Sequence, residues 1–356
     1  MERPPAGGFA WPVSPLCHLA LLDQRCSNTP FHGDIVMRSF SLMLSAILLA
    51  APGFAHAQQP VELTVMSFNI WGGGGNAGKP VDETVAAIKA VNPDIIGIQE
   101  TRLEPDPCTA EACVPVGESK AKAIAEMLGY FYYDQSQQNV ALWANAILSR
   151  YPIGKPTPHD LGVEIDVKGR KVYAFNLHLT DFPYQPYQVL NIEYGKAPFL
   201  KTAAEAEAAA KAARGPALDL FFQDLKLADG ADAAFVFGDF NEPSHLDWTE
   251  AAVKAGHQPL AVSYPSAQRF ETAGGFTDLF RAAFPDPVAK PAFTWTPTSE
   301  PTAKDDHHDR IDYTLGRAKT LKVVKAGIVG EKAPEADVVV TPWPSDHRAT
   351  MAVVQF

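Results

Sequence analysis

Five apolar segments with the character of buried β-strands end in side chains that can bind a metal ion or a phosphate. They are Thr64–Asn69, Asp94–Glu100, Lys171–His178, Ala233–Asn241 and Arg310–Asp312, the last of which continues into Tyr313. Asp346 and His347 lie just before a sixth such segment at the end of the chain. These ends are far apart in the sequence, so they form one group only if β-sheets bring them to a common rim. Acidic and amide oxygens gathered at such a rim suit a hard cation such as Mg²⁺.

The order of the strand and helix patterns predicts an α+β fold. Strand patterns such as Glu62–Ile70 and Val140–Trp143 are interspersed with helical patterns such as Pro80–Val91 and Thr202–Leu227, without strict alternation. The last of these helical patterns is interrupted near Gly215 and Pro216. We expect a four-layer αββα sandwich, in which two mainly antiparallel sheets pack face to face and helices cover the outer faces.

Length and charge limit the function further. The chain has 356 residues, of which 46% are hydrophobic, so it can bury a sizeable core. Because no Gly/Ser-rich linker divides residues 58–356, we expect this stretch to form a single domain. The net charge of -11 argues against tight, sequence-independent binding of nucleic acid, which needs Lys and Arg to neutralise phosphates. It does not exclude a nuclease whose groove alone is basic.

The N-terminal region has the pattern of a secretory signal peptide at residues 37–57. Met37 and Arg38 precede the mainly apolar stretch Ser39–Pro52, and Ala55-His56-Ala57 supplies the small residues of a cleavage site near Ala57. The apolar stretch is shorter than the ~20 residues of a spanning helix, so we expect a periplasmic or secreted protein without stable membrane insertion. Residues 1–36 show no periodicity, and we interpret them as a spurious or disordered N-terminal extension, with translation beginning at Met37.

Export leaves two cysteines, Cys108 and Cys113, in a loop flanked by prolines. In an oxidising compartment, two cysteines at this spacing in a loop are expected to form a disulfide. A zinc site would need further Cys or His residues nearby, and the next histidine is His159.

Seven short motifs occur in the order typical of one family. They are SFNIW (67–71), IQE (98–100), NAILSRYPI (145–153), NLHL (176–179), GDFN (238–241), RIDY (310–313) and SDH (345–347). Each motif is weak alone, but their order and spacing constrain one another. Together they resemble the endonuclease/exonuclease/phosphatase superfamily, which includes deoxyribonucleases, sphingomyelinases and inositol phosphatases. The resemblance implies the αββα sandwich and hydrolysis of phosphoric esters.

The resemblance also implies a metal site at the strand ends. Glu100 matches the principal Mg²⁺ ligand of the family, and Asn69 matches the residue that supports the metal shell and contacts phosphate. Asp346 is implied as a ligand at a second metal position, and Asp312 completes the implied metal set. A carboxylate at a strand end is chemically suited to Mg²⁺, with Mn²⁺ and Ca²⁺ as alternatives.

Catalytic roles follow from the same resemblance. Asp239 and Asn241 match the pair that orients the attacking water and holds the transition state; two residues apart on an extended segment, they lie on one face. His347 and Asp312 resemble a His-Asp dyad, with Asp309 as the second-ranked acid. Whether Asp239 or His347 takes the proton of the water stays open at this point. The implied phosphate-binding set is Asn69, His178, Asn241 and His347.

His178 bears on the substrate. AP endonucleases that resemble this family usually carry Tyr there, whereas deoxyribonucleases, sphingomyelinases and inositol phosphatases carry His, which can donate to a phosphate oxygen.

The FPYQPY segment (182–187), which follows His178, is either a wall of the substrate pocket or a packing loop. GGGNAGK (73–79) has the spacing of a P-loop, but Pro80 stands where the hydroxyl of Ser or Thr is needed.

The sequence therefore predicts a secreted, metal-dependent phosphoesterase that hydrolyses a phosphodiester or phosphomonoester by direct attack of an activated water. Its substrate is a small molecule, a lipid headgroup or a nucleic acid, and no obligate protein partner is inferred. The first alternative is a secreted nuclease acting on DNA or RNA. A more remote one is a non-catalytic binding protein on the same fold.

Overall fold

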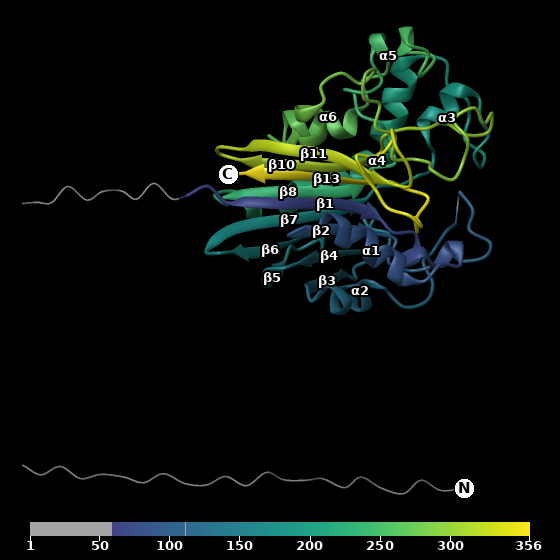
Figure 1. Ribbon diagram of the computed structural model, residues 1–356. Coiled ribbons are helices and arrows are strands. Elements are labelled where there is room, and N and C mark those ends of the chain that lie inside the picture. The colour runs from purple at the N-terminus through teal and green to yellow at the C-terminus, as the bar shows by residue number, and fades with distance from the viewer. Residues whose placement is uncertain (1–58, 111) are drawn as a thin grey trace, which may run out of the picture. The chain divides into compact units, whose positions relative to one another are not determined.

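The computed structural model describes residues 59–110 and 112–356 (Figure 1). The predicted signal peptide at 37–57 and the extension at 1–36 lie outside the described residues. Among those described, no helix combines the length and the apolar character that are needed to cross a membrane.

Two mixed β-sheets form the centre of the described part. The larger sheet contains, in spatial order, β12 (Val338–Val339), β11 (Lys322–Gly330), β13 (Ala349–Gln355), β1 (Glu62–Asn69), β2 (Ile95–Gln99), β4 (Asn145–Ser149) and β3 (Phe131–Gln135). The smaller sheet contains β5 (Ile153–Pro156), β6 (Gly162–Val167), β7 (Arg170–His178), β8 (Ala233–Asp239), β10 (Asp312–Ala318) and β9 (Thr277–Asp278). Most neighbouring strands are antiparallel, but β1 and β2, β7 and β8, and β11 and β12 run parallel.

The two sheets pack face to face through a shared apolar layer. Leu63, Val65 and Ile95 of the larger sheet meet residues such as Phe235 and Phe237 of the smaller one. The backbones come closest at Gly97, where an added Cβ would lie 2.4 Å from the Cβ of Phe237. Only glycine therefore fits at this position.

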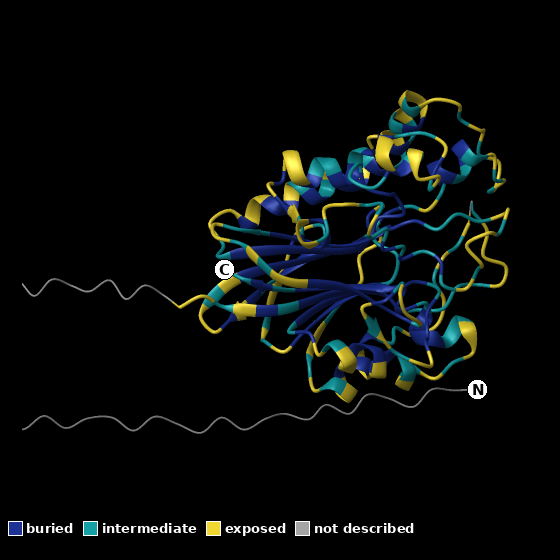
Figure 2. Ribbon diagram, turned by 45° about the horizontal axis from the view of Figure 1, so that its top comes forward, coloured by how far each residue is buried: buried dark blue, intermediate teal, exposed yellow. Residues whose placement is uncertain are grey.

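Helices cover both outer faces, so the predicted four-layer αββα sandwich is confirmed (Figures 1 and 2). The larger sheet is covered by α1 (Val81–Val91) and α2 (Ala121–Leu128), and the smaller by α4 (Ala203–Asp224) and α6 (Pro265–Thr272). The remaining helical elements are α3 (Gln185–Leu190), α5 (Glu250–Lys254), α7 (Leu279–Ala283), and the short 3₁₀ segments η1 (Gly72–Ala77) and η2 (Leu225–Ala228).

Two local expectations are wrong. Val140–Trp143 is a turn and not a strand, because Asn139 accepts the N–H of Ala141 with its side chain at 2.9 Å and so folds the backbone locally. The helix after Thr202 runs without a break through Gly215 and Pro216 as far as Asp224. The N-terminus of this helix carries a complete capping box, in which Thr202 and Glu205 satisfy each other's backbone N–H groups. The buried residues of the helix pack onto the smaller sheet, and this packing offsets the cost of the proline in the helix interior.

Candidate active site

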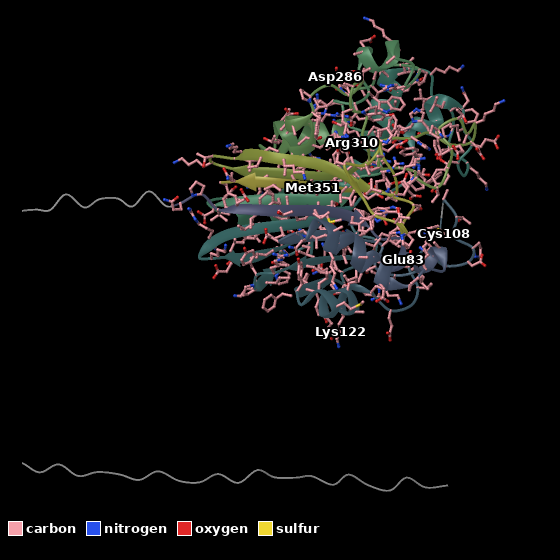
Figure 3. The ribbon with its side chains drawn as sticks, viewed as in Figure 1. Glu83, Cys108, Lys122, Asp286, Arg310 and Met351 are labelled. Atoms are coloured by element: carbon pink, nitrogen blue, oxygen red, sulfur yellow. A yellow bond between two sulfur atoms is a disulfide. The ribbon has the colours of Figure 1, made fainter. Side chains whose placement is uncertain are left out.

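The strand ends meet at one rim, as the sequence predicted. The parallel pairs β1–β2 and β7–β8 both end there, and β10 and β13 begin there because they run antiparallel to their neighbours. The register places His178 opposite Asp239, and Asp239 opposite Asp312. In Figure 1 this rim lies at the end of the sheets away from the C-terminus, among the loops. Figure 3 shows Cys108 in those loops and Met351 back within the sheet.

Asn69 joins two carboxylates from different sheets. Its Nδ2 donates to Glu100 Oε1 at 2.7 Å and to Asp239 Oδ2 at 3.1 Å, and one amide nitrogen carries the two hydrogens that this requires. Its Oδ1 accepts the N–H of Trp71 at 3.1 Å. Asn69 therefore contacts both acids through its nitrogen and holds them together at the rim.

His347 and Asp312 form the expected pair. His347 Nδ1 lies 2.9 Å from Asp312 Oδ2, and His347 Nε2 lies 3.5 Å from Asp239 Oδ2. Burial lowers the pKa of His347, but the charges of Asp312 and Asp239 outweigh it and raise that pKa well above its usual value. Thr294 Oγ1 accepts the N–H of Asp312 at 3.1 Å and fixes the start of β10.

Asp309, the second-ranked acid of the dyad, lies in a separate network. Its carboxylate accepts Tyr184 Oη at 2.7 Å and Trp248 Nε1 at 2.8 Å, and it lies 2.9 Å from His307 Nδ1. Asp312, and not Asp309, is therefore the carboxylate that contacts His347.

Asn241 links Asp239 to His178. The Asn241 backbone N–H donates to Asp239 Oδ1 at 2.9 Å, and Asn241 Nδ2 lies 3.1 Å from His178 Nε2. Burial lowers the pKa of His178, in contrast to that of His347. The rim thus combines one imidazole that favours the neutral form with one that favours the cation.

Glu100 and Asn241 both have positive backbone φ angles, of 55° and 48°. Asn adopts this left-handed region readily, but for Glu it is costly. The strained backbone at Glu100, directly after the end of β2, turns this side chain toward Asn69. Backbone strain of this kind is a feature of functional sites.

The carboxylates at the rim fit a divalent metal ion. One oxygen from each of Glu100 and Asp239 lies within 4.8 Å of the other, and a ring nitrogen of His347 lies within the same distance of both. Glu100 Oε2 is buried without a hydrogen-bond partner, so an oxygen remains free for a cation. Burial, together with the charge of Asp346, raises the pKa of Glu100 well above its usual range, and burial raises that of Asp346 to about 7. A bound cation would relieve this crowding of carboxyl groups.

A cavity of about 300 Å³ opens above these residues. Its floor contains six of the predicted site residues, namely Glu100, His178, Asp239, Asn241, Asp346 and His347. Asn69 and Asp312 do not line the cavity but contact floor residues. We call the remaining lining side chains the cavity wall, and they include Glu104, Trp143, Asp181, Tyr184, Tyr187, Tyr194 and Trp295.

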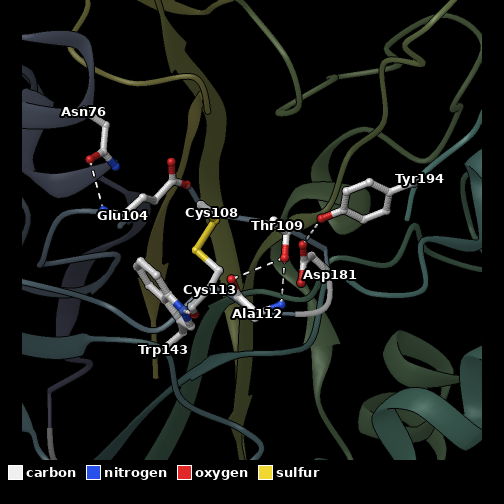
Figure 4. The surroundings of a disulfide bond; sticks show 9 residues. All are labelled: Asn76, Glu104, Cys108, Thr109, Ala112, Cys113, Trp143, Asp181 and Tyr194. Atoms are coloured by element: carbon white, nitrogen blue, oxygen red, sulfur yellow. Dashed lines mark hydrogen bonds between the residues drawn. A yellow bond between two sulfur atoms is a disulfide. The ribbon is translucent and has the colours of Figure 1, made fainter. Parts of the chain in front are cut away.

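Most of the wall was not predicted from the sequence. Tyr184 and Tyr187 belong to the FPYQPY segment, whose interpretation as a pocket wall is confirmed. Glu104, Asp181, Tyr194 and Trp295 lie in loops and carry no strand-end signal, and Trp143 ends the segment that was wrongly predicted to be a strand. The predicted disulfide between Cys108 and Cys113 is formed, and both cysteines line the cavity (Figure 4).

Buried polar links behind the rim also escaped sequence reasoning. Asn176 Nδ2 donates to the carbonyls of Ile98 and Ala146, at 2.9 Å each, and so connects β7 to the other sheet. Gln99 Nε2 donates to Asn176 Oδ1 at 2.6 Å. These bonds fix the distance between the sheets next to the site. The NLHL and IQE motifs contain these residues, but neither motif predicted this role.

The chain belongs to the endonuclease/exonuclease/phosphatase family, whose model matches residues 66–347. This family and its fold support hydrolysis of a phosphoric ester as the reaction class. A curated relative, "Uncharacterized protein F14F9.5" of Caenorhabditis elegans, is 26% identical over 311 residues, which cover 83% of this chain and 91% of the relative.

Two solved structures to which the chain is similar share less of its sequence than that relative does. Truncated TDP2 from Caenorhabditis elegans is 20% identical, with a TM-score of 0.46 and coverage of 83% of this chain and 97% of that one. A family protein from Bacteroides thetaiotaomicron is 17% identical, with a TM-score of 0.47 and coverage of 84% and 99%. At these scores the likenesses give no information about the substrate.

Proposed function

We propose that the protein is an exported, divalent-metal-dependent phosphoesterase that cleaves a phosphodiester or phosphomonoester by direct attack of water. The observation that carries this proposal is the convergence on Asp239. Asn69, Asn241, His178 and His347 all approach its carboxylate, while Glu100 offers an unpartnered oxygen beside it.

Glu100 would hold the metal, with Asp239 and His347 nearest to it and Asp346 at the edge of the same group. Mg²⁺ suits these oxygen-rich donors, and Mn²⁺ or Ca²⁺ are alternatives. When bound, such an ion supplies positive charge that stabilises the phosphoryl oxygens as negative charge develops on them.

The chain's own residues account for the other requirements of the reaction. Asp239 orients the water and accepts its proton, since it is the carboxylate on which the surrounding donors converge. The water oxygen forms a bond to phosphorus, one ester P–O bond breaks, and the departing oxygen takes a proton from solvent water. His347, held by Asp312, donates hydrogen bonds to the phosphoryl oxygens together with Asn241 and His178.

Export is supported by two independent features. The signal-peptide pattern at 37–57 is one, and the disulfide between Cys108 and Cys113 is the other, because disulfides persist in oxidising compartments. We therefore propose a periplasmic or secreted location.

The function is tested with bis(p-nitrophenyl) phosphate and p-nitrophenyl phosphate, each with added Mg²⁺ and with EDTA. We expect hydrolysis of at least one ester that EDTA abolishes and excess Mg²⁺ or Mn²⁺ restores. Hydrolysis that is unchanged by EDTA, or no hydrolysis of any phosphoric ester with added metal, would overturn the proposal.

A further inference from the structure

The charge of the cavity is unusual for a site that receives a phosphate ester. Five carboxyl groups line it, namely Glu100, Asp239 and Asp346 on the floor and Glu104 and Asp181 on the wall. Among the residues that the structure describes, no Lys or Arg lines this cavity. The floor acids are accounted for by the metal. Glu104 and Asp181 are not, and they would repel a ligand that carried only negative charge.

Glu104, Asp181 and Tyr194 form one corner of the wall, which we call the acidic corner. Tyr194 Oη donates to Asp181 Oδ2. Glu104 and Asp181 line the same cavity. Burial raises the pKa of Glu104, a hydrogen bond from Trp71 lowers it, and the nearby charge of Asp181 raises it further. Figure 4 shows the three side chains around the disulfide together with Trp143. Trp143 Nε1 donates to the carbonyl of Cys113 at 2.6 Å, so this ring is fixed beside the corner.

The tyrosine rings of the wall line the cavity at nearly right angles to one another and do not form a flat platform. Tyr187 is nearly perpendicular to Tyr184, at 86° and 4.9 Å between ring centroids, and to Tyr194, at 85° and 6.1 Å. Tyr184 and Tyr187 are anchored by hydrogen bonds to Asp309 at 2.7 Å and Asp306 at 2.5 Å. Proteins that bind single-stranded nucleic acid stack bases on aromatic side chains in a positively charged groove. Rings that line a cavity at nearly right angles, with nearby acids, instead suit an organic ammonium ion.

We propose that the cavity selects phosphate esters in which one organic group carries a methylated ammonium ion, as in phosphocholine esters. Tyr194, Asp181 and Glu104 hold the ammonium ion, while the floor holds the phosphoryl group. This inference rests on the proposed phosphoesterase function and names its substrate class. The ammonium serves recognition only and takes no part in the bond exchange described above. A cavity of about 300 Å³ is at the small end of ligand pockets, which suits a headgroup better than a duplex.

The sharpest test compares two esters that differ in one atom. One is p-nitrophenyl phosphocholine, and the other is its 3,3-dimethylbutyl analogue, in which carbon replaces the charged nitrogen. Hydrolysis of both is followed by ³¹P NMR with the full-length exported protein and Mg²⁺. We expect kcat/KM for the choline ester to exceed that for the neutral analogue by about 10- to 100-fold, which is the scale of cation–π and carboxylate contacts in a desolvated site.

Variants of the acidic corner assign the preference to its residues. In Asp181→Asn, Glu104→Gln and Tyr194→Leu we expect the ratio of the two kcat/KM values to fall to about threefold or less. Glu193→Gln is the matched control, because Glu193 adjoins Tyr194 in sequence but is exposed and does not line the cavity. It should keep the wild-type ratio. A ratio that stayed at the wild-type value in all three corner variants would overturn the assignment.

The remaining outcomes separate this inference from the proposed function. Equal hydrolysis of the two esters would overturn the ammonium selectivity and leave the phosphoesterase intact, whereas no hydrolysis of any ester would overturn the phosphoesterase itself. Faster cleavage of a single-stranded oligonucleotide, with a steep loss at high salt, would replace the inference with a nucleic-acid substrate. Activity on glycerophosphocholine or on sphingomyelin vesicles supports it and distinguishes a soluble ester from a lipid headgroup.

Discussion

The floor of the cavity and its wall are held in place by different means. Floor residues such as Glu100, Asp239 and His347 lie at the ends of strands or directly beside them, in backbone that the two sheets fix through their hydrogen-bond registers. Wall residues such as Glu104, Asp181 and Tyr194 lie in loops, which a disulfide and tyrosine–carboxylate hydrogen bonds hold together.

Because of this difference, we expect the floor to determine catalysis and the wall to determine which ester is bound. Catalytic groups must keep their positions within a fraction of an ångström, which strands achieve better than loops. Loops tolerate variation and can change which ester is bound without disturbing the chemistry. Changes at the floor should therefore reduce the rate for every substrate, and changes at the wall should alter selectivity or local stability.

The largest effect is expected from Asp239→Ala. Removing the residue that orients the water should lower kcat/KM for every hydrolysed ester by about 10³-fold or more. The thermal unfolding midpoint should change little, since the carboxylate lies among donors that can bind water instead. Steady-state kinetics and calorimetry check the two statements.

Asp224→Ala is the matched control for that variant. Asp224 is as buried as Asp239, with 1% of its surface exposed, but it pairs with His159 away from the cavity. We expect lower stability and nearly unchanged kcat/KM. If both variants lost activity equally, the effect would come from burial of an acid and not from its place at the rim.

Asp312→Asn should have the second largest effect. Losing the carboxylate beside His347 Nδ1 should lower kcat by about 10²-fold, because the imidazole loses the partner that fixes its tautomer and favours its charge. Asp309→Asn makes the comparison sharp. It should weaken the wall network and lower stability by about 1–3 kcal/mol, with a much smaller loss of kcat. Equal losses of kcat in the two variants would contradict the assignment of the dyad to Asp312.

The last effect is expected in stability at high pH and leaves the rate of hydrolysis nearly unchanged. Burial lowers the pKa of His307, but Asp309 overcomes this and raises it to about 9, from an ordinary value of 6.5. Because the pKa is higher in the folded state, the interaction of protonated His307 with Asp309 stabilises the fold fully below about pH 6.5. This contribution to the free energy of unfolding is lost as the pH rises through about 9. It amounts to roughly 3 kcal/mol at most. Urea unfolding of the wild type and of His307→Gln at pH 6.5 and pH 10 should show a difference that shrinks at the higher pH; a constant difference would exclude a charged pair.

Much of the floor could be predicted from the sequence because the place of a residue along a strand determines where it lies in the sheet. A polar residue after an apolar run must lie at a sheet edge, and the parallel order of β1 with β2 and of β7 with β8 brings those edges together. The choice of Asp312 over Asp309 also followed from its place in RIDY. The four layers were predictable for the same reason, since apolar faces must be covered.

The wall could not be predicted because its contacts join loops that are distant in sequence. Tyr184 contacts Asp309, 125 residues away, and Tyr187 contacts Asp306, 119 residues away. Neither pair has a periodic pattern. Local side-chain bonding misled the prediction too, because Asn139 folds the apolar segment Val140–Trp143 into a turn although its sequence resembles a strand. The hydrogen bonds that Asn176 makes across the sheets could not be predicted either, because the sequence does not show which partner an asparagine inside a strand will bind.

The proposed reaction depends first on a metal site that the strand ends form around Glu100. Isothermal titration of Mn²⁺ into the EDTA-stripped protein tests it without depending on the substrate. We predict saturable binding in the wild type and at least about tenfold weaker binding in Glu100→Gln, which keeps the size of the side chain but removes its charge. Equal affinity for Mn²⁺ in the two proteins, or no binding in either, would contradict the claim.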